Sequence, residues 1–97
     1  MNKILDTVNS FKIESSQMII SCNKINIILP IKNGSVIVNI INELKEKIGI
    51  NDINKNDQII VLYKETEFEK NYIKPIKIIK LLNYTFYESS DSENNII

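Results

Sequence analysis

Residues 25–50 read INIILPIKNGSVIVNIINELKEKIGI and carry the densest structural signal in the 97-residue chain. The run from Ile25 to Leu29 is rich in β-branched side chains, which favour a strand. Pro30 and the pair Asn33-Gly34 follow it, and residues of these types end strands and form turns. This half of the stretch therefore predicts a short strand that stops at a turn.

The second half of the stretch has a helical period. Apolar residues recur there at spacings of three and four, while polar residues fill the opposite face. Ser35 can cap the first turn through its hydroxyl group, and Gly49 can adopt the left-handed conformation that stops a helix. The pattern predicts an amphipathic helix over residues 36–48. Its apolar stripe consists of Ile37, Ile40, Ile41, Leu44 and Ile48.

The pair Asn33-Gly34 also supports an alternative, because Asn-Gly between two apolar runs is the strongest short-range signal for a tight β-hairpin. In this alternative, Ser35 to Ile41 forms the return strand, and the β-branched residues there are poor helix formers. The hairpin leaves only Asn42 to Ile48 for a helix, which is shorter than usual. We favour the helix and keep the hairpin as the alternative.

The composition indicates one domain with its own core. Isoleucine, asparagine and lysine dominate, and alanine, arginine, histidine and tryptophan are absent, a bias typical of an AT-rich genome. Twelve lysines balance twelve acidic residues, so no net charge attracts nucleic acid or an anionic membrane. Without arginine, the chain also lacks the bidentate fork used to recognise phosphates and bases. Neither nucleic acid nor a membrane is an expected partner.

The residues that usually carry chemistry are scarce. There is no histidine, and Cys22 is the single cysteine, which excludes an internal disulfide and a cysteine metal cluster. We expect Cys22 to be a small buried hydrophobe. Gly34 and Gly49 are the two glycines, and neither belongs to a phosphate-binding pattern. We therefore expect no catalytic residues, no metal, no cofactor and no enzyme activity.

The segments before the Asn-Gly turn divide into an arm and a hairpin. Residues 1–16 form the arm, in which residues 2–10 have helical spacing and residues 11–14 alternate like a strand. Gln17 to Ser21 is a second extended run, and residues 22–24 provide a tight reversal into the strand that starts at Ile25. These two runs predict a β-hairpin.

The second half of the chain predicts a strand, a helix, a strand and a tail. Gln58 to Tyr63 is apolar on both faces and β-branched, as a central strand should be. Pro75 suits the first turn of a short helix that ends near Asn83. Tyr84 to Glu88 is a strand by residue type, and residues 89–97 form a polar, disordered tail.

This order of elements resembles the ubiquitin-like β-grasp family over residues 17–88. Two local motifs carry the resemblance, namely EKIGI at residues 46–50 and DQIIV at residues 57–61. The resemblance implies an α+β fold, with a mixed four- to five-stranded sheet and one main helix packed across it. It also implies a non-enzymatic protein–protein interaction module, such as an adaptor or a complex subunit, that presents an apolar patch on the sheet face away from the helix.

Strand alternation and the resemblance together select the candidate partner-binding residues. Ile59, Val61 and Tyr63 share one face of their strand, and Ile60 and Leu62 share the other. Matching the strand position selects Ile60 and Leu62 for the patch. The chain ends without the Gly-Gly of the conjugated family members, so conjugation to a target is not expected.

A second class of function stays open beside the adaptor. The protein could be a small structural or regulatory α/β protein that acts as a homodimer, although a monomer is the favoured expectation. Residues 1–10 lack the features of a secretory signal, and no run approaches the length of a membrane span. We therefore expect the protein in the cytoplasm or the nucleus.

Overall fold

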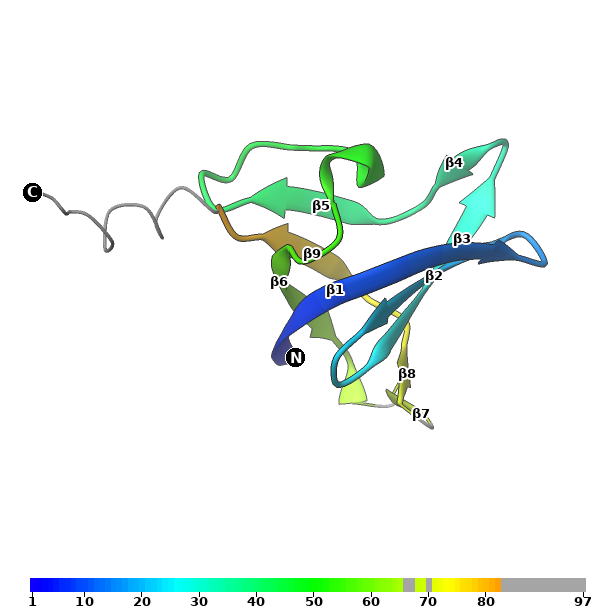
Figure 1. Ribbon diagram of the computed structural model, residues 1–97, viewed down its shortest axis with the longest axis horizontal. Coiled ribbons are helices and arrows are strands. Elements are labelled where there is room, and N and C mark those ends of the chain that lie inside the picture. Colours follow the sequence, from blue (N-terminus) through cyan, green and yellow to red (C-terminus); the bar gives the residue numbers. More distant parts are fainter. Residues whose placement is uncertain (66–67, 70, 83–97) are drawn as a thin grey trace, which may run out of the picture.

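The computed structural model describes residues 1–65, 68–69 and 71–82 (Figure 1). The predicted strand at residues 84–88 and the predicted tail at residues 89–97 lie outside this part of the chain. The described part contains nine strands, one short 3-10 helix and no α-helix. In chain order these elements are β1 (Asn2–Glu14), β2 (Gln17–Cys22), β3 (Asn26–Lys32), β4 (Ser35–Val36), β5 (Asn39–Asn42), η1 (Ile50–Asp52), β6 (Gln58–Tyr63), β7 (Phe68–Glu69), β8 (Tyr72–Ile73) and β9 (Lys77–Lys80).

Strand β1 is the longest element, and the sheet is built on both of its halves. Its first half, from Asn2 to Thr7, pairs antiparallel with β6. Its second half, ending at Glu14, pairs antiparallel with β2. The register shifts between Val8 and Ser10, where a bulge bends the strand and increases its twist. Figure 1 shows β1 as one curved strand that crosses the molecule.

The remaining pairings curl the sheet into a half-barrel. Strands β6, β1, β2 and β3 lie side by side in that order, which is a Greek key because β6 returns to lie beside β1. Strand β8 then pairs parallel with β3, and β9 pairs antiparallel with β6. A short link of three residues joins β8 to β9, so residues 72–80 bridge the two sides of the sheet.

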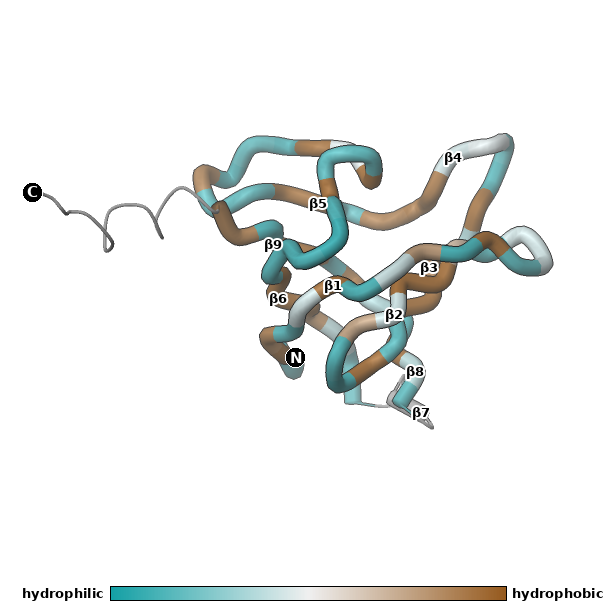
Figure 2. The backbone as a smooth tube through the Cα atoms, viewed as in Figure 1, coloured by the Kyte–Doolittle hydropathy of each residue, from teal (hydrophilic) through white to brown (hydrophobic). Residues whose placement is uncertain are grey.

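The core fills the inside of the curl and consists mainly of isoleucine. Alternate residues of each strand point inward, as Ile59 and Val61 of β6 show, since both are completely buried. Ile53, in the segment after η1, is also buried in this cluster. Figure 2 shows the hydrophobic residues along β3, β5 and β6. The fully buried large side chains are Val8, Ile20, Ile27, Leu29, Ile59, Val61, Ile73 and Ile78.

The predicted helix over residues 36–48 is wrong, and with it the α+β fold and the resemblance to the ubiquitin-like β-grasp family. Residues Asn39–Asn42 form β5, which pairs parallel with β9 and alternates between exposed and buried positions. Leu44, a member of the predicted helical stripe, is 61% exposed, so the stripe is not the buried face. The β-branched residues favour a strand here, and pairing with β9 gives them a place in the sheet.

The alternative hairpin at Asn33-Gly34 describes this region better. Both residues have positive φ angles, of 54° and 78°, as a type I′ turn requires. The turn joins β3 to β4, with Lys32 opposite Ser35. The return strand is short, because the chain leaves β3 after Val36 to reach β9. Residues 35–36 therefore pair with β3, and residues 39–42 pair with β9.

Two other helix predictions are also wrong. Residues 2–10 belong to β1, and Lys77–Lys80 form β9. By contrast, the hairpin of β2 and β3 is confirmed, with Ser21 opposite Asn26. The central position of β6 is confirmed too, since β1 and β9 pair with its two edges. The correct predictions concern strands whose partners are close in sequence or whose residues are apolar throughout.

Candidate functional site

The predicted patch residues Ile60 and Leu62 lie on the outer face of the half-barrel. Their neighbours Ile59 and Val61 are completely buried on the inner face, while Ile60 and Leu62 are half-buried. The predicted alternation of β6 is therefore confirmed. Neither residue is part of the core cluster.

The sheet extends this pair into a row of aliphatic side chains. Ile60 lies opposite Leu5 of β1 on one side and opposite Ile79 of β9 on the other. Ile79 in turn lies opposite Ile41 of β5. Cross-strand neighbours point to the same face, so the row runs across four strands without a polar interruption. We call this row of Leu5, Ile60, Ile79 and Ile41, with Leu62 beside it, the outer stripe.

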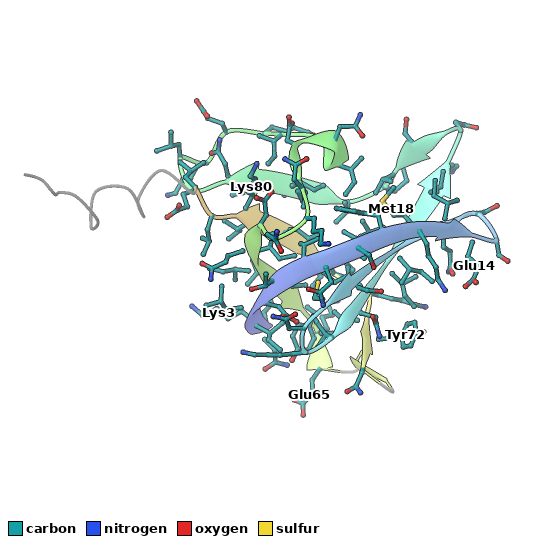
Figure 3. All side chains as sticks on the ribbon, in the orientation of Figure 1. Lys3, Glu14, Met18, Glu65, Tyr72 and Lys80 are labelled. Carbon is teal, nitrogen blue, oxygen red and sulfur yellow. The ribbon has the colours of Figure 1, made fainter. Side chains whose placement is uncertain are left out.

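The outer stripe has positive charges on one flank. Leu62 lies between Lys3 of β1 and Lys77 of β9, and Asn39 of β5 lies next to Lys77. On the other flank, Thr7 lies opposite Gln58. Along the paired parts of these four strands, the outward positions therefore carry two lysines and no carboxylate. Figure 3 shows Lys3 at the N-terminal end of β1, where it borders this face.

A second apolar surface lies on the other side of β1 and was not predicted. Two adjoining hollows of about 550 Å³ and about 420 Å³ share Met18, Ile50 and Asn51 in their linings. We call the two together the β1 groove. In Figure 3, Met18 lies between β1 and the strands β4 and β5. Apolar lining residues include Phe11, Ile13, Met18, Val36, Ile48 and Ile50.

The β1 groove could not be predicted because segments far apart in the sequence form its walls. Phe11 and Ile13 come from β1, Val36 from β4, and Ile48 and Ile50 from the segment around η1. The strand-like alternation of residues 11–14 was the one usable signal. Phe11 and Ile13, which share one face of β1, are 37% and 69% exposed, and a group of neighbouring exposed apolar side chains is a cue for a binding surface.

The buried polar groups of the described chain serve the fold. The Asp6 carboxylate accepts hydrogen bonds from the backbone N–H groups of Lys24 and Ile25 at 2.8 and 3.0 Å, which ties β1 to the turn between β2 and β3. Asp57 accepts from the backbone N–H of Asn54 at 2.7 Å and lies 3.4 Å from the Lys80 ammonium group. Buried carboxylates that bind backbone donors and a cation in this way are structural.

Asn42 and Cys22 complete this group of buried side chains. The Asn42 side chain accepts from the backbone N–H groups of Leu44 and Glu46 and donates to the Glu46 carboxylate, which holds the bend after β5. Cys22 is buried, as predicted. Desolvation, with a smaller contribution from Asp6, raises the pKa of its thiol from 9.0 to about 12. A thiol that stays protonated is a poor nucleophile.

Comparison with known proteins gives no relative, because no family model, no curated protein and no solved structure matches the chain. In the part of the chain that the structure describes, no helix has the length and apolar character needed to cross a membrane. The same residues contain no cluster of three or more His, Cys, Asp or Glu side chains placed to hold a metal ion. The outer stripe and the β1 groove are therefore the two candidate sites.

Proposed function

We propose that this protein is a non-enzymatic protein-binding module that contacts a partner protein through the outer stripe, with Ile60 and Leu62 at its centre. One observation carries the proposal, namely the row of four aliphatic side chains that faces outward across β1, β6, β9 and β5. A contiguous apolar surface on a folded protein is typical of an interaction site.

The charges beside the stripe favour one kind of partner. Lys3 and Lys77 flank Leu62, so a complementary surface would have an apolar centre with carboxylates along one rim. Such charges mainly set the association rate and exclude wrong partners. A second copy of this chain is a poorer fit, because the outward positions beside its own outer stripe, along the paired parts of these four strands, carry lysines and no carboxylate to meet them.

The architecture raises a second candidate, which the charges disfavour. Greek-key barrels of the OB type often bind oligonucleotides or oligosaccharides, but a fold-level analogy does not assign a function. Single-stranded nucleic acid is bound by a positively charged groove with stacking aromatic side chains. This chain has a net charge of zero and no arginine. A protein partner fits the outer stripe better.

The test replaces the central aliphatic side chain by a charged one. Truncation of a central apolar anchor costs about 2 kcal/mol or more of binding free energy, which is about a 30-fold loss of affinity. A buried carboxylate in the interface adds its desolvation cost. We therefore expect Ile60→Asp to weaken binding by at least about 30-fold. The matched control is Leu44→Asp, because Leu44 is 61% exposed and lies outside the stripe.

The experiment has two steps. Immobilised wild-type protein and both variants are first exposed to a lysate of cells that produce the protein, and proteins retained by the wild type and by Leu44→Asp but lost from Ile60→Asp are identified by mass spectrometry. Each is then purified and titrated by calorimetry. Direct binding that is weakened by Ile60→Asp and by neutralisation of Lys3 supports the proposal.

Three results would contradict it. Equal loss with both variants would indicate a general solubility effect. Titrations without binding would exclude a direct partner for this face. A wild-type dimer in sedimentation that Ile60→Asp converts to a monomer would assign the stripe to self-association instead. Circular dichroism melting curves of all three proteins show that the variants are folded.

A further inference from the structure

We propose that the β1 groove binds an extended peptide segment of another protein, which adds as a strand to the free edge of β1. The segment would carry two apolar side chains two residues apart, with a carboxylate on either side. This site is separate from the outer stripe. It rests on the hydrogen-bonding pattern of β1, on the two hollows beside it and on the charges at their rim.

The hydrogen-bonding pattern shows which backbone groups of β1 face away from β2. The backbone N–H of Cys22 donates to the Ile25 carbonyl at 2.9 Å, so Cys22 bonds toward β3. In a strand, alternate residues bond to opposite sides. Ile20 and Met18 therefore also bond toward β3, and their cross-strand neighbours Phe11 and Ile13 form non-hydrogen-bonded pairs with them. The backbone N–H and C=O groups of Phe11 and Ile13 thus point away from β2.

Among the described residues, none pairs with the outward edge of β1 beyond Val8. Strand β6 covers this edge only as far as Thr7, and Val8 makes the last two bonds, to the backbone of Asp57 and Asn56. No other described segment bonds to the backbone of Phe11 or Ile13 on this side. The edge therefore presents two N–H donors and two C=O acceptors in strand geometry. Such an edge is the template used in β-strand addition.

The two hollows are placed to receive the side chains of an added strand. Phe11 lines one hollow and Ile13 lines the other, and Met18 lies in both. Residues i and i+2 of a strand point to the same face, about 6.6–6.8 Å apart. Phe11 and Ile13 have this relation, so a strand paired with them would direct two of its own alternate side chains into the two hollows. The linings favour aliphatic side chains.

The charges at the rim select the flanking residues of the peptide. Lys55 is the charged residue in the lining beside Phe11, and Lys47 is the charged residue in the lining beside Ile13. No carboxylate lines either hollow among the described residues. With one lysine in the lining of each hollow, the groove complements a segment with an acidic residue on both sides of its apolar pair. An amphiphile such as a fatty acid would use the hollows but not the unpaired backbone groups.

The first experiment selects the ligand class directly. A displayed library of random heptapeptides is panned on immobilised wild-type protein, and the sequences recovered are compared with those recovered on Lys47→Glu/Lys55→Glu protein. We expect the wild type to enrich peptides with two apolar residues two apart and acidic flanks, and the double variant to lose them. No enrichment, or enrichment without this alternation, would overturn the proposal.

The second experiment distinguishes strand addition from simple apolar contact. The most enriched peptide is synthesised with a fluorophore, and its affinity is measured by fluorescence polarisation for Ile13→Pro and Ile13→Ala. Both changes remove the isoleucine side chain, but only proline removes the N–H group, which β2 does not use. We expect Ile13→Pro to bind about tenfold more weakly than Ile13→Ala. Equal affinities would contradict strand addition.

Changes to the backbone of the peptide also test whether it pairs with β1, without altering the protein. Backbone N-methylation at single peptide positions removes one N–H at a time. In an added strand only every second N–H faces β1, so the affinity for wild-type protein should fall at alternate positions. Uniform sensitivity, or none, would show that the backbone does not pair. The variant Ile60→Asp serves as the control, since the outer stripe should not affect this affinity.

Discussion

At the scale of single residues, Cys22 shows how the fold changes the chemistry of a side chain. Burial beneath the sheet raises the pKa of its thiol from 9.0 to about 12, and the nearby Asp6 carboxylate adds to the shift. The thiol therefore stays protonated across the physiological range. Reactivity of a cysteine depends on its thiolate. The residue contributes apolar contacts to the core, and its protonated thiol is a poor nucleophile.

The raised pKa of the Cys22 thiol predicts how the stability of the protein depends on pH. The unfolded thiol loses its proton near 9.0, whereas the folded thiol keeps it until about 12. Between these values the unfolded state binds fewer protons, so the free energy of unfolding falls as pH rises through this window and is unaffected below it. Urea unfolding of wild type and Cys22→Ala at about pH 8 and about pH 10.5 measures the difference.

The comparison is between the two proteins, because the contributions of all groups other than Cys22 are then the same in both. The wild type should lose more stability than Cys22→Ala between the two pH values. Equal losses would show that the thiol titrates alike in both states. A maleimide reagent provides a second check, since it should modify unfolded but not folded protein.

At the scale of elements, the turns fix where the strands begin and end. The turn between β3 and β4 needs positive φ angles at Asn33 and Gly34, and these two residue types adopt them most readily. The turn between β1 and β2 has the same form, with φ angles of 50° at Ser15 and 62° at Ser16. Two serines accept this conformation less easily, so the sequence predicted a boundary between residues 16 and 17 but no hairpin there.

The two glycines provide a matched test of this argument. A Cβ at Gly34 would meet no atom within 4 Å, so Gly34→Ala should be destabilising only through its φ of +78°. We expect a loss of about 1–2 kcal/mol in the free energy of unfolding. Gly49 has a φ of −104°, and a Cβ there would lie 3.8 Å from the Asp52 carboxylate, an ordinary contact.

Gly49→Ala should therefore leave stability unchanged within about 0.5 kcal/mol. Urea titrations of the two variants give both values. A larger loss at Gly49 than at Gly34 would mean that the turn after β3 is not the I′ turn described here.

At the scale of the whole molecule, the curl of the sheet separates an inside from an outside. Ile59 and Ile60 are adjacent in β6 and identical in chemistry, yet Ile59 is completely buried while Ile60 lies in the outer stripe. The difference comes from the fold, since β8 and β9 bring the far strands around one core. Within the described part of the chain, the same curl leaves the second half of β1 without a partner strand on one edge.

This arrangement predicts unequal effects of the same substitution. Ile59→Ala removes atoms from a packed core and should cost about 3–4 kcal/mol, within the range for buried isoleucines. Ile60→Ala removes part of an outward, half-buried side chain and should cost about 1 kcal/mol. Denaturant unfolding of both variants measures the two losses in the free energy of unfolding. Equal costs would mean that both faces of β6 are covered in solution.

The elements that could be predicted from the sequence were those whose pairing partner is close along the chain or whose own residues are distinctive. The hairpin of β2 and β3 and the strand β6 were predictable, because adjacent runs pair through a short reversal and β6 is apolar on both faces. The helix over residues 36–48 failed for a specific reason. In a segment so rich in isoleucine, residues spaced by three and four arise by chance, and the β-branched residues were the better guide.

The candidate surfaces also had a part that could be predicted from the sequence and a part that could not. The alternation of Ile60 and Leu62 against Ile59 and Val61 was evident from the sequence, because it follows from the geometry of one strand. The rest of the outer stripe comes from three other strands, so its extent depends on which strands are neighbours. The β1 groove depends on tertiary structure even more, since β1, β4 and the segment around η1 meet there.

The sequence by itself determined local features, namely the apolar strands, the turn at Asn33-Gly34, the alternation of β6 and the absence of a net charge. These depend on propensity, on turn chemistry and on counting, which need no distant partner. Only the tertiary structure decided that residues 39–42 pair with β9 and that residues 72–80 bridge β3 and β6. The physical reason is that strand pairing is non-local: a strand's partner supplies its hydrogen bonds and its buried face, and one sequence does not say which partner that will be.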